Sequence, residues 1–252
     1  MTAGLRLDHH DRAGSALTYR LAPAFAIPET GTLIRATYGT GFKAPSLYQL
    51  FAPRTAWGPI GNAFLEPERA AGWDAGIEQD VLGGAIVLSA GYFRNVFRNL
   101  ITFDFVRGYV NVGRAKTEGL ELGLEARPAD GFQASLSYTR QKANDEDTGL
   151  ALLRRPDHKL AVELAGRLLP PLEASLSVLH IGQSEDRDFS AFPYPLVTLA
   201  PYTLLNAAFN LRLGGGLEAI ARFDNILDTH YVSGWGYGRP GFTATVGVRL
   251  GL

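Results

Sequence analysis

The strict alternation of apolar and polar residues constrains this chain more than any other feature. Between Phe132 and Thr139 every even position is apolar and every odd position is polar. Residues 242–252 repeat the pattern, with Thr, Gly and Arg at the odd positions. Successive side chains of a β-strand point to opposite faces of a sheet, so this period predicts strands with one apolar and one polar face.

The same period recurs along the chain and predicts an all-β fold of about twelve strands. The predicted strands span residues 2–9, 15–26, 31–39, 70–81, 84–104, 108–127, 131–142, 158–168, 172–182, 201–212, 216–227 and 241–252. Tight turns lie near 27–30, 81–83, 128–130, 169–171 and 213–215. The intervening connections are long at 40–69, 143–157, 183–200 and 228–240, and short near 10–14 and 105–107. A tight turn at every second junction predicts an antiparallel up-and-down meander with both chain ends on one rim.

Two all-β architectures fit this alternation. In a soluble antiparallel sandwich the apolar face is the core, whereas in a transmembrane barrel it meets lipid. The polar face is rich in Ser, Thr, Gly, Gln, Arg and Glu, which suits a wet lumen. Short turns on one rim and long loops on the other are typical of outer-membrane barrels. We therefore expect residues 1–252 to form one transmembrane β-barrel domain, with the sandwich as the alternative.

Composition excludes several other classes of protein. The 24 basic and 25 acidic residues leave a net charge of -1, which gives no electrostatic footprint for nucleic acid. No apolar run reaches the ~18 residues of a membrane-spanning helix. The absence of cysteine excludes disulfides and thiolate metal sites. Residues 1–10 lack the pattern of a signal peptide and already alternate, so we expect the chain to begin inside a barrel.

One motif is more specific than the alternation. It spans residues 35–51 and contains Tyr38, Gly39, Gly41, Phe42, Lys43, Ala44 and Pro45. This segment resembles a strand and loop of TonB-dependent outer-membrane receptors. Similar motifs follow in the family's order, at Glu66, Pro67 and Glu68, at Asn111, Gly113, Gly119 and Glu121, at Arg154 and Arg155, and at Asn225, Asp228 and Tyr231. The sequence departs from the family at Ala63, Asp74 and Leu252, where proline, glutamate and an aromatic residue are usual.

The resemblance implies a fold and a location. Receptors of this family have a barrel of about 22 strands closed around an N-terminal plug. This chain would supply the C-terminal half of such a barrel, without the plug or a signal peptide. It would lie in the outer membrane of a Gram-negative cell with its C-terminus in the periplasm. The Arg154-Arg155 pair is most similar to vitamin B12 receptors, with ferric-siderophore receptors as near neighbours.

The resemblance also implies partners. These are outer-membrane lipid, the barrel-assembly machinery, which would read Thr245, Gly247 and Leu250 in the last strand, and cobalamin or a ferric siderophore as ligand. TonB would be a partner only if a plug-bearing chain is supplied, so we expect no active import by this chain alone. No cofactor is expected. The alternative is a small passive pore, formed if the twelve or so strands close on themselves.

Candidate ligand contacts are aromatic and arginine side chains on the long loops. Aromatic rings there would stack against a corrin ring or a siderophore catechol. The alternative is that they pack the loops together or lie in the membrane interface. The candidates are Tyr48, Phe51, Arg54, Trp57, Phe192, Tyr194, Trp235 and Tyr237.

Metal and enzyme sites are weaker hypotheses. Carboxylates of the kind that bind Ca²⁺ occur in loops at Asp145, Glu146, Asp147, Asp186 and Asp188, but solvated loop charge is the favoured interpretation. The histidines are scattered over different strands, so no metal site is predicted. An outer-membrane hydrolase that uses His180 and Ser184 is a further alternative, yet no G-x-S-x-G elbow accompanies these residues. We expect a protein that is not an enzyme.

Overall fold

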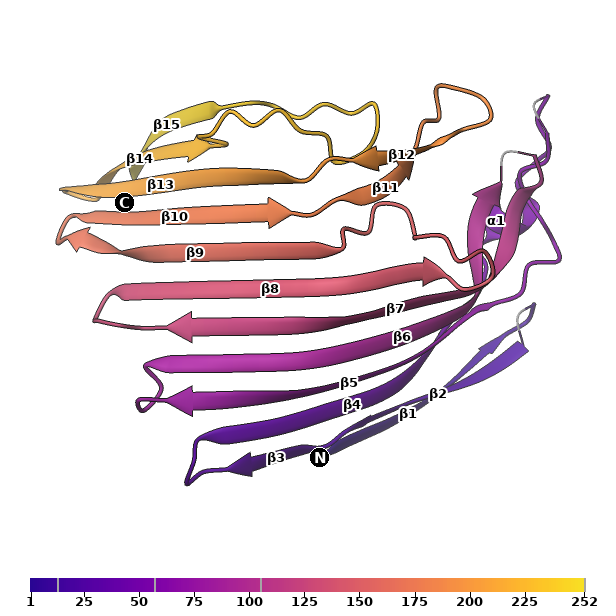
Figure 1. Ribbon diagram of the computed structural model, residues 1–252, viewed down its shortest axis with the longest axis horizontal. Helices are drawn as coiled ribbons and strands as arrows, with labels where there is room; N and C mark the ends of the chain where they lie inside the picture. The colour runs from indigo at the N-terminus through magenta and orange to yellow at the C-terminus, as the bar shows by residue number, and fades with distance from the viewer. Residues whose placement is uncertain (13, 57, 105, 252) are drawn as a thin grey trace.

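The computed structural model describes residues 1–12, 14–56, 58–104 and 106–251, most of them in antiparallel strands (Figure 1). The strands of the main sheet are β1 (Thr2–His10), β2 (Gly14–Ala22), β3 (Ala24–Ile27), β4 (Thr32–Lys43), β5 (Glu68–Val81), β6 (Ile86–Asp104), β7 (Gly108–Ala126), β8 (Phe132–Asp145), β9 (His158–Leu169), β10 (Leu172–Ile181), β13 (Tyr202–Gly214), β14 (Leu217–Asp224) and β15 (Thr243–Leu250). The remaining elements are α1 (Leu47–Phe51), β11 (Ser184–Arg187) and β12 (Leu196–Leu199). Within the described residues no helix is long and apolar enough to cross a membrane.

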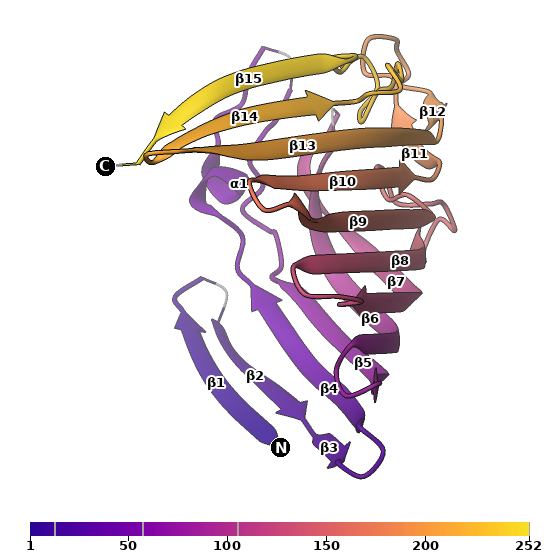
Figure 2. The ribbon, with the colours of Figure 1, turned by 90° about the vertical axis from the view of Figure 1, so that its left-hand side faces the viewer.

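The main sheet is an up-and-down meander. Its strands follow the order β1-β2-β4-β5-β6-β7-β8-β9-β10-β13-β14-β15, with β3 paired to β4. The predicted all-β antiparallel topology is therefore confirmed. The sheet is open, because β1 and β15 are its two edges and no strand pairing in the described residues joins them (Figure 2).

The strand boundaries differ from the predicted ones in identifiable places. The strand expected at 15–26 is divided into β2 and β3 at Pro23, because proline has no N–H to donate to a neighbouring strand. The loop expected at 183–200 contains the β11–β12 hairpin, and the loop expected at 40–69 contains α1. Strand β4 also runs on to Lys43, so this part of the sheet extends further toward the long loops than expected.

The two rims of the sheet differ as predicted. Tight turns connect the strands on the left of Figure 1, and the long loops lie on the right. Gly131 ends one tight turn with a φ of 78°, a conformation that residues with a side chain rarely adopt. Leu250 lies opposite Leu217, so β15 ends on the rim of the tight turns.

The sheet is a single curved layer with little core. Its apolar side chains are exposed even at the centre of strands, as for Leu5 (79%) and Val246 (79%). The buried hydrophobic residues among those described are Ala16, Leu50, Leu65, Ala115, Ala143 and Leu199. In the described part of the chain no second sheet covers the apolar face, since the other sheet is the short β11–β12 pair. The alternative of a soluble sandwich is therefore wrong.

Register assigns every strand residue to one of two faces. Phe132 lies opposite Gly166, which lies opposite Ala174, and Ala174 lies opposite Phe209. Directly opposed residues share a face, so this row belongs to the apolar, outer face. The residues between them, such as Gln133 and Ser175, form the polar, inner face.

Candidate functional site

The loop between β4 and β5 begins with a rigid element. Ser46 and Gln49 form a capping box, in which the Gln49 N–H donates to Ser46 Oγ (3.2 Å) and the Ser46 N–H donates to Gln49 Oε1 (2.8 Å). Leu50 anchors the short helix with 6% of its surface exposed. Tyr48 and Phe51 remain 59% and 49% exposed, so α1 presents two aromatic side chains on the rim of the long loops.

The motif residues at the end of this loop tie it to β6 and β7. The Glu66 N–H donates to Asn111 Oδ1 (2.8 Å), and Asn111 Nδ2 donates to the Glu66 carbonyl (2.9 Å). Asn99 Nδ2 donates to the Glu66 carboxylate (2.7 Å). Glu68 accepts from the Ile101 N–H (2.9 Å) and from Lys43 Nζ (3.0 Å). These side chains hold the loop in place, which is a structural role.

The specific motif of β4 is divided between the two faces. Tyr38 lies on the outer face with its ring 5.8 Å from that of Tyr19, and Arg69 lies over the Phe42 ring at 5.9 Å. Gly39 and Gly41 share the inner face with Lys43, opposite Gly72 and Ala70. Ala44 and Pro45 lead into α1, and Pro67 leads into β5. The motif therefore shapes the strand and its exit toward the loop.

Two motif glycines provide space. A Cβ at Gly113 would collide with the Asp147 carboxylate, and one at Gly119 would collide with the Arg140 carbonyl and the Phe93 ring. Glu121 follows Gly119 on the inner face.

A second cluster joins three loops through Asp186. Its carboxylate is fully buried (0% exposed) and accepts from Arg154 Nε (3.0 Å), the Arg187 N–H (2.9 Å) and the Trp235 N–H (2.8 Å). Burial raises the pKa of Asp186, but the hydrogen bonds from Trp235, Arg187 and Arg154 outweigh it and hold that pKa below its ordinary value. The interpretation of Asp186 as solvated loop charge is wrong, because its partners on other loops exclude water.

The aromatic candidates divide into two groups. Phe192 and Tyr194 lie with their rings 5.8 Å apart on the loop between β11 and β12, where Phe192 is 84% exposed. Trp235, beside Asp186, and Tyr237 lie on the last loop and are 41% and 71% exposed. Tyr48, Phe51 and the exposed Arg54 form the other group, on the loop that follows β4. Trp57 lies outside the described residues, as does Leu252 of the last strand.

The motif at Asn225, Asp228 and Tyr231 closes the last loop. Asn225 is 5% exposed; its Oδ1 accepts from the Thr229 N–H (3.0 Å) and its Nδ2 donates to the Thr229 carbonyl (3.0 Å). Asp228 accepts from the Phe242 N–H (2.8 Å), which fixes the start of β15. Tyr231 packs against Tyr202 with ring centroids 4.3 Å apart. These residues again build the scaffold of the rim.

Two histidines expected to be scattered are neighbours. Register places His180 opposite Leu160, and its Nε2 lies 3.3 Å from Nε2 of His158. Its Nδ1 lies 2.8 Å from Thr203 Oγ1. Both ring nitrogens of His180 are therefore engaged by groups other than Ser184. Among the described residues, no cluster of three or more His, Cys, Asp or Glu side chains could hold a metal ion.

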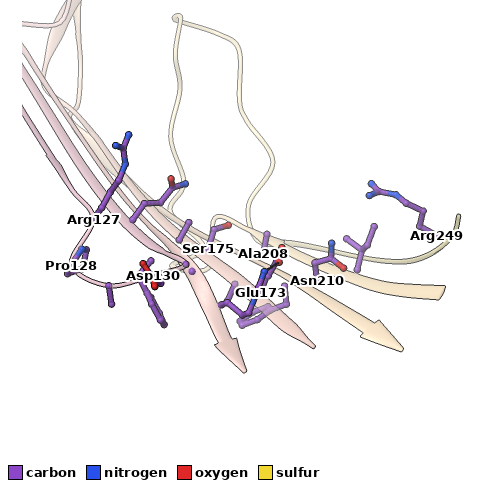
Figure 3. A pocket seen from close by; sticks show the side chains of 18 residues that line it. Arg127, Pro128, Asp130, Glu173, Ser175, Ala208, Asn210 and Arg249 are labelled. Carbon is purple, nitrogen blue, oxygen red and sulfur yellow. Dashed lines mark ion pairs between the residues drawn. The ribbon is translucent and has the colours of Figure 1, made fainter. Parts of the chain in front are cut away.

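A hollow with a volume of about 950 Å³ lies on the inner face near the tight turns (Figure 3). Arg127, Asp130, Ser175, Asn210 and Arg249 are among its lining residues. Asn210 Oδ1 is buried there without a hydrogen-bond partner in the described structure. The sequence candidates were side chains on the long loops, so they did not include this hollow. The sequence signal that could have found it is the polar residue at every second position of each strand, because those residues form the inner face.

Comparison with known sequences identifies relatives. A family model described as "TonB dependent receptor-like, beta-barrel" matches residues 1–226. The vitamin B12 transporter BtuB of Vibrio cholerae serotype O1 is 30% identical to this chain over 241 residues. That match covers 94% of this chain and 37% of the transporter, so the chain spans well under half the length of this curated relative.

Comparison with solved structures gives the same fold. The ferric enterobactin receptor PfeA from Pseudomonas aeruginosa matches with a TM-score of 0.79 and 24% identity, over 98% of this chain and 42% of the receptor. The siderophore receptor PirA from the same organism matches with a TM-score of 0.75 and 22% identity, over 98% of this chain and 42% of that receptor. The family model covers most of the chain, and these structures share its curved wall of strands. This chain belongs to the TonB-dependent receptor family and forms part of its β-barrel.

Proposed function

We propose that this chain forms part of the barrel wall and of the ligand-capturing rim of an outer-membrane receptor for a corrinoid. The observation that carries the proposal is the single-layer sheet, with exposed apolar side chains on one face and polar side chains on the other. Such a sheet needs lipid on the apolar side and water or protein on the polar side. The rim of the tight turns, with the C-terminus, faces the periplasm in this proposal, and the long loops face outward.

The ligand assignment rests on the rim and on the sequence relative. A vitamin B12-like ligand comes first, because the relative at 30% identity is named for vitamin B12. A ferric siderophore is the second candidate, since the structural neighbours are siderophore receptors and share the fold. Exposed rings at Phe192, Trp235 and Tyr237 provide flat surfaces against which either ligand can stack.

Energy-coupled import belongs to the whole receptor. The relatives are much longer than this chain, and the plug and the TonB-contacting segment are parts that the wall itself does not supply. We propose that TonB acts on this wall only together with a plug-bearing segment. The barrel-assembly machinery would recognise β15, whose outer face carries Val246, Val248 and Leu250.

A small passive pore is the competing function. It requires β1 to pair with β15, whereas these strands are the edges of an open sheet. Each unpaired backbone N–H or C=O group in lipid costs on the order of several kcal/mol, so β1 and β15 each need a partner strand. We favour pairing with further strands of a wider barrel over closure of this chain on itself.

Ligand binding tests the proposal. The protein assembled in outer-membrane vesicles should bind cyanocobalamin saturably, with ferric enterobactin as the comparison ligand. Phe192→Ala removes an exposed ring and should weaken binding about 3- to 10-fold, the range expected for one lost stacking contact.

Phe64→Ala is the matched control, since Phe64 is a similarly exposed loop aromatic (92%, against 84% for Phe192) outside the candidate set. It should leave the affinity within about twofold, the spread of an ordinary surface substitution. Absence of saturable binding of both ligands, or an equal loss in the two variants, would contradict the proposal.

A further inference from the structure

A band of basic side chains crosses the outer face of β5 to β8. Arg69 lies opposite Arg98, and Arg98 lies opposite Arg114. Glu118 lies opposite both Arg94 and Lys142, so these two residues share the same face. Lys116 and Arg140 complete the set on this face. We call the group formed by Arg69, Arg94, Arg98, Arg114, Lys116, Arg140 and Lys142 the basic band.

The basic band lies on the same face as the apolar residues that meet lipid. Arg94 follows Tyr92 by two positions on β6, and Tyr92 lies opposite Leu120. Arg140 follows Tyr138 by two positions on β8, and Tyr138 lies opposite Leu122. Residues two apart on a strand share a face, so the band directly borders the apolar surface.

Strand length places the band at the edge of the hydrocarbon. A membrane β-strand crosses the hydrocarbon in about 9–11 residues. Counting from the tight-turn ends of β6 and β8, at Ile86 and Phe132, the ninth residues are Arg94 and Arg140. The band is therefore at the depth of lipid headgroups, in the leaflet on the side of the long loops.

Most charges of the band have no carboxylate partner. Glu118 binds Lys116 (2.8 Å), and Glu146 binds Arg114 (3.1 Å). Among the described residues, the remaining basic side chains of the band form no ion pair within 4.0 Å of a carboxylate, although Arg94 interacts electrostatically with Glu118 across the strand pair. All of them are exposed; they are Arg69, Arg94, Arg98, Arg140 and Lys142. Like charges directly opposite each other, as at Arg98 and Arg114, destabilise a sheet unless an anion lies between or beside them.

The inner face provides the contrast. There Lys43 pairs with Glu68 (3.0 Å), Arg222 with Asp224 (2.9 Å) and Arg249 with Glu218 (3.4 Å). Most basic residues of the inner-face strands thus pair with carboxylates within the chain, with Arg20 and Lys159 as exceptions among the described residues. The unpaired charges of the outer band indicate that their anions come from outside the chain.

We infer that the basic band binds the phosphate groups of anionic lipids in the leaflet surrounding the long loops, an inference that rests on the proposed membrane location. Arginine and lysine bind phosphate oxygens through charge-assisted hydrogen bonds. The acyl chains of the same lipid lie against Leu120, Leu122 and Tyr138. An anionic lipid thus matches the band and the adjoining apolar surface at once, which a water-soluble acidic protein does not.

The test measures lipid enrichment around the folded protein. The protein is reconstituted in vesicles of phosphatidylcholine containing a minor fraction of phosphatidylglycerol, and the lipid that co-purifies in its annulus is quantified by mass spectrometry. The wild type should enrich phosphatidylglycerol over the bulk fraction. Arg94→Gln combined with Arg140→Gln should lower that enrichment by about fivefold or more, because each basic side chain near a membrane surface contributes on that scale.

A matched variant removes two charges from the inner face. Arg20 and Lys159 are exposed there, opposite Gly39 and Thr139. Arg20→Gln combined with Lys159→Gln should retain the enrichment of the wild type. Equal loss in both double variants, or wild-type annular lipid at the bulk composition, would overturn the inference and favour a protein partner for the band.

Two further measurements keep the outcome decisive. If the Gln variant fails the heat-modifiable gel shift that reports folding, Arg94→Lys with Arg140→Lys replaces it and should keep most of the enrichment, since charge is preserved. Cyanocobalamin binding is measured on the same samples. Lipid enrichment without corrinoid binding would support the lipid inference and contradict the corrinoid as ligand. Corrinoid binding without lipid enrichment would support the corrinoid as ligand and contradict the lipid inference.

Discussion

The two faces of the same strands carry opposite kinds of side chain, and β15 shows the difference within a few residues. Val246 and Val248 are 79% and 71% exposed on the outer face, although they are apolar. Arg249, the next residue, lies on the inner face and pairs with Glu218 (3.4 Å). In a soluble protein the apolar face would be the buried one. Under the proposed membrane location, the comparison teaches that the alternation in this chain reflects two environments, with lipid at the outer face and water at the inner face.

The largest expected effect comes from placing one charge on each face of β10. Leu176→Arg puts a guanidinium among Leu164 and Ala207 on the outer face and should cost about 2–4 kcal/mol in lipid. Ser175→Arg, one residue away on the inner face, should cost less than about 1 kcal/mol because that face is wet. Equilibrium unfolding in urea from lipid vesicles measures both. Equal costs would show that the two faces share one environment.

A smaller effect is expected when one glycine on each face of the sheet is replaced by alanine. On the inner face a Cβ at Gly119 would meet the Arg140 carbonyl as well as the Phe93 ring, whereas on the outer face a Cβ at Gly166 would meet the Phe132 ring. A ring can rotate into lipid, but a backbone carbonyl within a ladder cannot move. Gly119→Ala should therefore destabilise by about 1–3 kcal/mol, and Gly166→Ala by less. The same unfolding experiment would refute this if the order of the two were reversed.

The alternation continues into the β11–β12 hairpin, where neighbouring carboxylates have opposite surroundings. Asp186 is fully buried between loops, whereas Glu185 is only half-buried and accepts from Thr198 Oγ1 (3.1 Å) on the opposite side of the hairpin. Asp186→Asn should accelerate hydrogen exchange in the loops around Arg154 and Trp235. Glu185→Gln removes the same charge and should leave exchange there unchanged. Faster exchange in both variants would assign the effect to charge rather than to the buried contacts.

The pH dependence of this cluster follows from the lowered pKa of Asp186. Because the ionised form is favoured in the folded state, its stabilising contribution is present above the carboxyl pKa of the unfolded chain, about 3.9, and is lost as pH falls through the lower folded value. Loop protection, corrected for intrinsic exchange, should be constant from neutral pH down to about pH 4 and fall below it. In the Asp186→Asn variant this step should be absent.

The smallest expected effect is at an exposed inner-face ion pair. Arg35 and Glu78 are 3.9 Å apart and largely exposed, so Arg35→Gln should cost between about 0 and 1 kcal/mol. A larger loss of unfolding free energy would show that water does not screen this ion pair, and would contradict a water-filled inner face.

Sequence predicted the wall of this molecule well because a period of two is clear in strands such as β8 and β15. It predicted the rim less well. Elements such as α1 and β11 are shorter than any detectable period, and α1 forms because Ser46 and Gln49 cap it. The contact between His158 and His180 depends on the register of two strands, which spacing alone does not reveal.

The motif residues illustrate a second limit. These motifs identified the family, yet Glu66 and Asn111 form hydrogen bonds with each other. The motif residues therefore stabilise the loop and do not mark the ligand contacts. Burial of Asp186 likewise depends on three loops meeting, and no local pattern distinguishes it from the neighbouring Glu185. Ligand contacts on the rim consequently stay predictions.

The central claim is that lipid covers the outer face and water the inner one, and depth-dependent fluorescence quenching tests it most directly. The chain contains no cysteine, so single cysteines at Leu176, Val246, Ser175 and Thr245 can each carry one environment-sensitive fluorophore. In the membrane-assembled protein, we predict quenching by nitroxide-labelled lipid at Leu176 and Val246, and quenching by aqueous iodide at Ser175 and Thr245. Equal accessibility of neighbouring positions to both quenchers would contradict the account.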